Sequence, residues 1–114
     1  MIIANLEERI MANVDGSGID YNEVPADFPY GDDERPPDRW FAWTICEDVV
    51  LHLCKKCGLI KSKSHRSVLP VDILYQEYLH ICALGWGTEQ EIRFVFRRVA
   101  ACLRWSAPDA VRRP

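Results

Sequence analysis

The chain has 114 residues, 48% of them hydrophobic, with four tryptophans and a formal net charge of −3. This is enough apolar material for a single compact domain to bury a core without disulfides, and it excludes an extensively disordered chain. No apolar run reaches the roughly 18 residues of a membrane span, and no signal-peptide pattern opens the chain. We therefore expect a soluble, cytoplasmic protein whose five cysteines remain reduced thiols.

The small net charge hides an uneven distribution. Residues 1–48 hold 12 acidic and 3 basic side chains, whereas residues 49–114 hold 5 acidic and 11 basic ones. Two lobes of opposite potential would steer a charged partner, and they would also be compatible with a homodimer.

Apolar residues at helical spacing, Ile3, Leu6, Ile10 and Val14, predict a first helix over residues 3–14. Residues 13–23, NVDGSGIDYNE, then resemble an EF-hand calcium loop. The loop is one residue short between Gly18 and Ile19, which displaces Glu23, and Pro25 prevents an exit helix. We interpret this stretch as a helix end followed by turns, and leave cation binding open.

Residues 15–37 are rich in proline, glycine and acidic side chains, and predict a long irregular loop between the first two helices. A second helix is expected from Asp38, a plausible N-cap, to Cys57, with Gly58 as the residue that ends it. Its predicted core stripe consists of Ala42, Ile45, Cys46, Val49, Val50, Leu53 and Cys57.

Pro70 suits the first turn of a third helix, expected over residues 70–84. Its predicted apolar face is Leu74, Tyr75, Tyr78, Ile81 and Cys82. Thr88 and Glu91 form a capping-box pattern that begins a fourth helix, which extends to about Trp105 and is stopped by Pro108. Its predicted core stripe is Ile92, Val95, Phe96, Val99 and Leu103. The sequence thus predicts an all-α fold: one domain, residues 1–114, with about four helices.

The most specific metal-binding pattern is C-x-x-C-G, in which Cys54 and Cys57 resemble half of a zinc knuckle. A second matching pair is missing, and both cysteines also fit the buried stripe of a helix, where a thiol acts as a small apolar group. We predict core thiols and no metal or cofactor, with zinc left open.

Catalysis is not expected. The chain has no G-x-S-x-G, no glycine loop for phosphate and no H-E-x-x-H. Its cysteines and histidines show no spacing that by itself assembles a nucleophile, a base and an orienting group.

A DNA-binding alternative rests on residues 70–105, where two helices joined by Gly85-Trp86-Gly87 are similar to a helix-turn-helix. The second of these helices would enter the major groove. Its candidate base-reading and phosphate-binding residues, with those of the preceding basic connection, are Lys61, Lys63, Gln90, Arg93, Arg97 and Arg98.

The acidic half favours a protein partner over DNA, because twelve carboxylates must be kept away from phosphate in a complex with DNA. Aromatic and acidic residues around the second predicted helix would contact a basic, nucleic-acid-handling protein: Tyr30, Asp32, Asp33, Glu34, Trp40 and Trp43. One of the two tryptophans is expected to be an exposed anchor unless the long loop covers it. The preferred hypothesis is an inhibitor or adaptor, by analogy with phage-encoded anti-CRISPR proteins.

Overall fold

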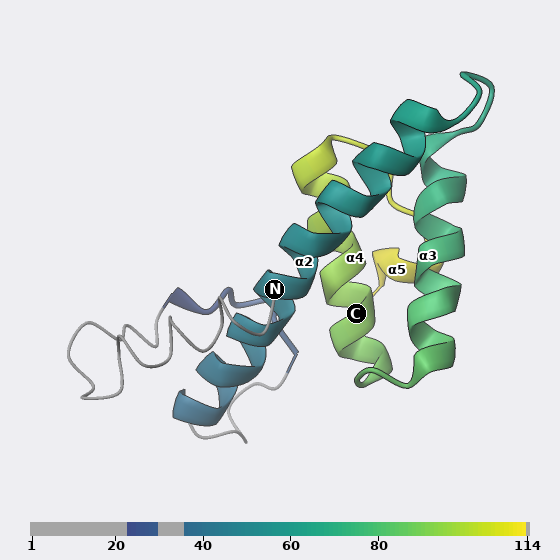
Figure 1. Ribbon diagram of the computed structural model, residues 1–114. Helices are drawn as coiled ribbons and strands as arrows, with labels where there is room; N and C mark the ends of the chain where they lie inside the picture. The colour runs from purple at the N-terminus through teal and green to yellow at the C-terminus, as the bar shows by residue number, and fades with distance from the viewer. Residues whose placement is uncertain (1–22, 30–35, 114) are drawn as a thin grey trace. The chain divides into compact units, whose positions relative to one another are not determined.

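The computed structural model describes residues 23–29 and 36–113 (Figure 1). In these ranges the regular structure is helical and contains no strand, which confirms the all-α class. The helices are α2 (Pro36–Lys63), α3 (Pro70–Leu84), α4 (Glu89–Leu103) and α5 (Asp109–Arg112). The predicted helix over residues 3–14, the calcium-like stretch up to residue 22 and the acidic tip of the loop lie outside the described residues.

The chain divides into two compact units, residues 1–49 and 50–114. The first unit contains residues 36–49 of α2, and the second contains residues 50–63 of α2 together with α3, α4 and α5. The single-domain organisation stays a prediction. Within residues 23–29 and 36–113, none of the helices combines the length and apolarity needed to cross a lipid bilayer.

Helix α2 is longer than predicted, because it continues through Gly58 to Lys63. A glycine inside a helix costs conformational entropy but does not by itself end the helix. The chain turns only after Lys63, where the Ser64 hydroxyl donates to the Ile60 carbonyl at 2.6 Å. Lys61 then ties the following loop to the helix, since its Nζ donates to the Val68 carbonyl at 2.7 Å.

Helix α3 begins and ends as predicted. Pro70 fits the first turn because proline has no backbone N–H, and an N–H there would have no acceptor within the helix. Gly85 ends the helix in the left-handed conformation, with φ 64°. The buried residues of α3 are Ile73, Leu74 and Tyr78. The expectation that Tyr75 belongs to the buried face is wrong, because its side chain is exposed.

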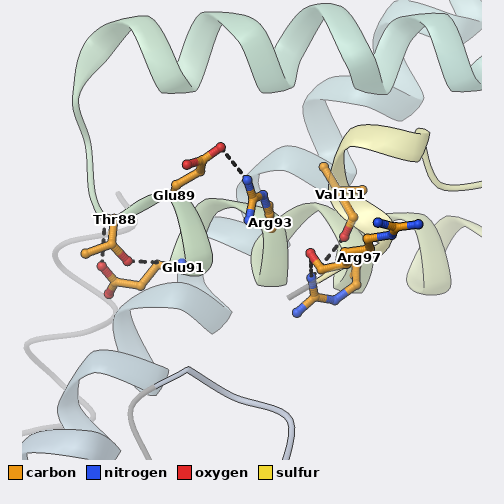
Figure 2. A network of polar contacts seen from close by, with 7 residues as sticks. Thr88, Glu89, Glu91, Arg93, Arg97 and Val111 are labelled. Atoms are coloured by element: carbon orange, nitrogen blue, oxygen red, sulfur yellow. Dashed lines mark hydrogen bonds and ion pairs between the residues drawn. The ribbon is translucent and has the colours of Figure 1, made fainter.

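Helix α4 begins with the predicted capping box (Figure 2). The Glu91 amide donates to Thr88 Oγ1 at 3.2 Å, and the Thr88 amide donates to Glu91 Oε1 at 2.9 Å. The helix ends at Leu103, where Arg104 takes the left-handed conformation (φ 57°) and the Trp105 amide donates to the Ala100 carbonyl at 2.9 Å. The Arg104 and Trp105 amides thus donate to carbonyl groups at the end of α4 that would otherwise lack a hydrogen-bond partner.

The core of the second unit is built mainly around α4. Its buried side chains are Ile92, Phe94, Val95, Phe96, Val99 and Ala100. Tyr78 of α3 meets Phe96 edge-to-face, with ring centroids 5.7 Å apart, and α3 and α4 lie side by side (Figure 1). Val50, Leu53 and Cys57 of α2 are also buried, as their stripe predicts. Burial of each large apolar side chain contributes roughly 1.5–3 kcal/mol.

Candidate functional site

The beginning of α2 is covered by the segment 23–29 of the same unit. Arg39 Nη2 donates to the Pro25 carbonyl at 2.9 Å and to the Phe28 carbonyl at 3.4 Å. The Arg39 guanidinium also lies over the Phe28 ring, 5.7 Å from its centroid. Val24 and Phe28 are buried. Part of the predicted long loop therefore folds back and is held by a cation–π contact and two hydrogen bonds from one side chain.

The two tryptophans that were candidate anchors differ in burial. Trp40 is buried, with 6% of its surface exposed, and Trp43 is half-buried. Trp40 is therefore not an exposed anchor. The other predicted protein-binding residues, Tyr30, Asp32, Asp33 and Glu34, lie outside the described residues.

Two apolar side chains of the first unit are exposed instead. Phe41 is 42% exposed and Ile45 is 40% exposed, and one helical turn separates them on α2. The placement of Ile45 in the core stripe is thus wrong. The buried Trp40 ring supports the Phe41 ring edge-to-face, with centroids 5.6 Å apart. Side chains four residues apart on a helix are neighbours, so Phe41 and Ile45 form one small apolar patch.

The spacing of Phe41 and Ile45 was visible in the sequence, but their exposure was not. Helical periodicity finds apolar faces, and it does not tell which face the rest of the chain covers. The neighbour of this pair on the same helix face is acidic: Asp38, three residues before Phe41, is exposed in the first turn of α2. We call Phe41, Ile45 and Asp38 the α2 patch.

The arginines proposed for DNA recognition have partners within the protein. Arg93 pairs with Glu89 (Figure 2). A hydrogen bond with Tyr78 raises the pKa of Arg93. Arg97 Nη1 donates to the Val111 carbonyl at 2.9 Å and to the Arg113 carbonyl at 3.2 Å. Arg98 is half-buried.

The remaining candidates for DNA recognition differ in the exposure and hydrogen bonding of their side chains. Lys61 donates to the Arg66 and Val68 carbonyls, whereas the side chains of Lys63 and Gln90 are exposed. Of the six candidates, these two are the exposed ones. Gln90 lies in the first turn of α4, where a recognition helix places its base-reading residues.

The cysteines of the C-x-x-C pattern behave as helix residues. Cys57 is fully buried, and burial, followed by the nearby Glu77 carboxylate, raises the pKa of its thiol to about 11. Burial, followed by the neighbouring Cys102, raises the pKa of Cys54 to about 11. In the part of the chain that the structure describes, no three His, Cys, Asp or Glu side chains converge to hold a metal ion.

Comparison of the chain with known protein families, with curated proteins and with solved structures gave no match.

Proposed function

We propose that the protein is a non-catalytic interaction module that acts in the cytoplasm as an inhibitor or adaptor. Its partner would be a protein with a basic, nucleic-acid-binding surface and a shallow apolar pocket. The observation that carries this proposal is the exposed pair Phe41 and Ile45 on α2. An aromatic ring held from behind by a buried tryptophan loses little side-chain entropy on binding, which suits it to anchor a complex.

Charge supports the choice of partner. The α2 patch belongs to the half of the sequence that carries 12 acids and 3 bases, and Asp32, Asp33 and Glu34 are separated from the helix only by Arg35. Complementary charge increases the association rate, while buried apolar anchors mainly slow dissociation. The two groups of residues therefore have separable effects on binding kinetics.

The test begins with tagged protein retained on a resin in nuclease-treated lysate from cells that produce it. Affinity and kinetics are then measured with the purified partner. Phe41→Ala with Ile45→Ala should weaken affinity by at least about tenfold, chiefly through faster dissociation. Reversing the charges of Asp32, Asp33 and Glu34 should instead slow association and reduce its dependence on salt.

Leu84→Ala is the matched control, because Leu84 is an apolar side chain that is 64% exposed outside the α2 patch. Its affinity should equal that of the wild type. If the double variant of the patch binds as well as the Leu84 variant, the proposed surface is wrong.

The exposed Gln90 in the first turn of α4 favours one second candidate, a helix-turn-helix regulator of DNA. Fluorescence anisotropy with duplex DNA tests it with Gln90→Ala and Lys63→Ala, two exposed positions whose loss does not disturb the core. Duplex binding that these variants weaken, together with an unaltered Phe41→Ala variant, would favour DNA over a protein partner.

A further inference from the structure

Residues 49–71 contain five lysine or arginine side chains, two histidines and no acidic residue. They include the C-terminal half of α2 and the turn that joins it to α3, which extends beyond the ends of both helices (Figure 1). Lys56 is paired with Glu77 of α3, with 2.9 Å between Nζ and Oε2. The cations of this stretch whose side chains are exposed are Lys55, Lys63 and Arg66. This end of the second unit therefore presents positive charge to solvent.

Apolar side chains are exposed among these cations. Leu59 lies one helical turn from both Lys55 and Lys63 on α2, so the three side chains are neighbours on one face. Leu59 and Leu69 are each 56% exposed, and Val68 in the turn is also exposed. Such apolar area stays in contact with water unless a partner covers it.

The turn is held against the end of α2 by hydrogen bonds. Lys61 Nζ donates to the Val68 carbonyl at 2.7 Å and to the Arg66 carbonyl at 3.5 Å. The Val68 amide donates to the His65 carbonyl at 2.9 Å. A surface whose backbone is already ordered loses little entropy when it binds. We call the exposed residues of this region the basic tip: Lys55, Leu59, Lys63, Arg66, Val68 and Leu69.

We propose that the basic tip binds the surface of a lipid bilayer that contains anionic phospholipids. Lysine and arginine near such a surface are attracted by its negative potential. Exposed leucine and valine side chains leave water by entering the boundary between headgroups and acyl chains. Contact of this kind is peripheral, and it requires no helix that crosses the bilayer.

The composition of the basic tip favours a lipid surface over a nucleic acid. Phosphates of DNA or RNA would neutralise the cations but would leave Leu59 and Leu69 in water. Residues 55–69 contain no Phe, Tyr or Trp on which bases could stack, and no Asn or Gln to read adenine. An anionic bilayer contacts both the charged and the apolar side chains. The basic tip lies in the second unit and shares no residue with the α2 patch, so the two proposals are tested independently.

The experiment measures co-sedimentation of the full-length protein with vesicles of phosphatidylcholine, alone or with about 30% phosphatidylserine. The wild type should sediment with the anionic vesicles only, and added salt should release it. Lys63→Glu with Arg66→Glu should weaken binding at least about 25-fold, because each basic residue near the surface contributes about fivefold. Arg112→Glu with Arg113→Glu makes the same change of charge at exposed positions outside the basic tip and should weaken binding far less.

A second pair of variants tests the apolar contact. Leu59→Gln with Leu69→Ser should weaken binding at least about tenfold and leave its salt dependence unchanged. The fold should be retained, because glutamine is a good helix former and serine is a preferred N-cap at position 69, which has no side-chain cap in the wild type. Leu51→Gln with Leu84→Ser changes two exposed leucines outside the basic tip and should bind like the wild type.

Asp72 allows a test that misfolding cannot imitate. It is exposed in the first turn of α3, three residues after Leu69. Asp72→Asn removes a negative charge beside the basic tip and should strengthen binding to anionic vesicles by about two- to fivefold.

Three results would overturn the proposal: no binding to anionic vesicles, equal binding to neutral vesicles, or binding that the leucine variant leaves unchanged. Duplex DNA is tested in parallel by fluorescence anisotropy. If the lysine and arginine variant weakens DNA binding while the wild type ignores vesicles, the basic tip is a nucleic-acid surface. Thermal unfolding of each variant shows whether the fold itself was disturbed.

Discussion

Arg97 of α4 holds the C-terminal end of α5 through the Val111 carbonyl, with 2.9 Å between Nη1 and the oxygen (Figure 2). The same guanidinium nitrogen donates to the Arg113 carbonyl, so one cation serves the carbonyl groups at the end of a helix. The Val111 side chain is fully buried, so α5 is held both by this buried side chain and by the hydrogen bond to the Val111 carbonyl.

Arg97→Ala should therefore lower the free energy of unfolding by about 1–2 kcal/mol, because hydrogen bonds from a charged donor are lost at a partly buried site. Urea unfolding followed by circular dichroism measures this change. Arg66→Ala removes an exposed arginine from the loop before α3 and serves as control. An equal loss in both variants would show that the Arg97 bonds contribute nothing specific.

Two glycines should respond to alanine with opposite signs. Gly58 is inside α2, and a Cβ atom there would have no neighbour within 4 Å, so Gly58→Ala should stabilise the protein by up to about 1 kcal/mol. Gly85 has φ 64°, and Gly85→Ala should destabilise it by about 1 kcal/mol, although space is equally open. Urea midpoints that move in the same direction for both variants would contradict this assignment.

Thr88→Ala removes the hydroxyl that accepts from the Glu91 amide and should cost about 1 kcal/mol of stability. Thr88→Ser keeps the hydroxyl and is the matched control, with an unfolding free energy close to that of the wild type. The capping box would be energetically unimportant if alanine and serine behaved alike in thermal unfolding.

The buried Cys57 thiol should make stability depend on alkaline pH. Its pKa is raised from 9.0 to about 11, so its contribution is complete below pH 9 and is lost as the pH rises to about 11. The loss amounts to at most about 1.4 kcal/mol per pH unit, because the unfolded chain releases the proton first. Cys57→Ala should show a shallower decline over this range, whereas an unchanged slope would contradict the assignment.

Local backbone chemistry explains what the sequence predicted well. The bounds of α3 follow from Pro70 and Gly85, and the beginning of α4 follows from Thr88 and Glu91. These signals act within one turn of the chain and depend little on distant contacts. Gly58 misled the prediction for α2, because a glycine ends a helix only where the chain adopts the left-handed conformation, and here it does not.

The candidate site depended on contacts that no local pattern contains. Trp40 is buried, and Arg39 binds the carbonyl groups of Pro25 and Phe28 far back in the sequence; neither contact can be read from helical spacing. Ile45 was exposed although it fits the apolar stripe. Short α5 was also missed, since four residues after Pro108 carry too little periodicity to predict a helix.

The left-handed Arg104 at the end of α4 has an evolutionary consequence. A side chain with a Cβ atom is strained in this conformation by about 1 kcal/mol relative to glycine. Every arginine codon is one base change from a glycine codon, so mutation repeatedly offers this chain a more relaxed helix end. A change from arginine to glycine at this position thus removes one surface charge and relieves the backbone strain. It leaves the buried core unchanged.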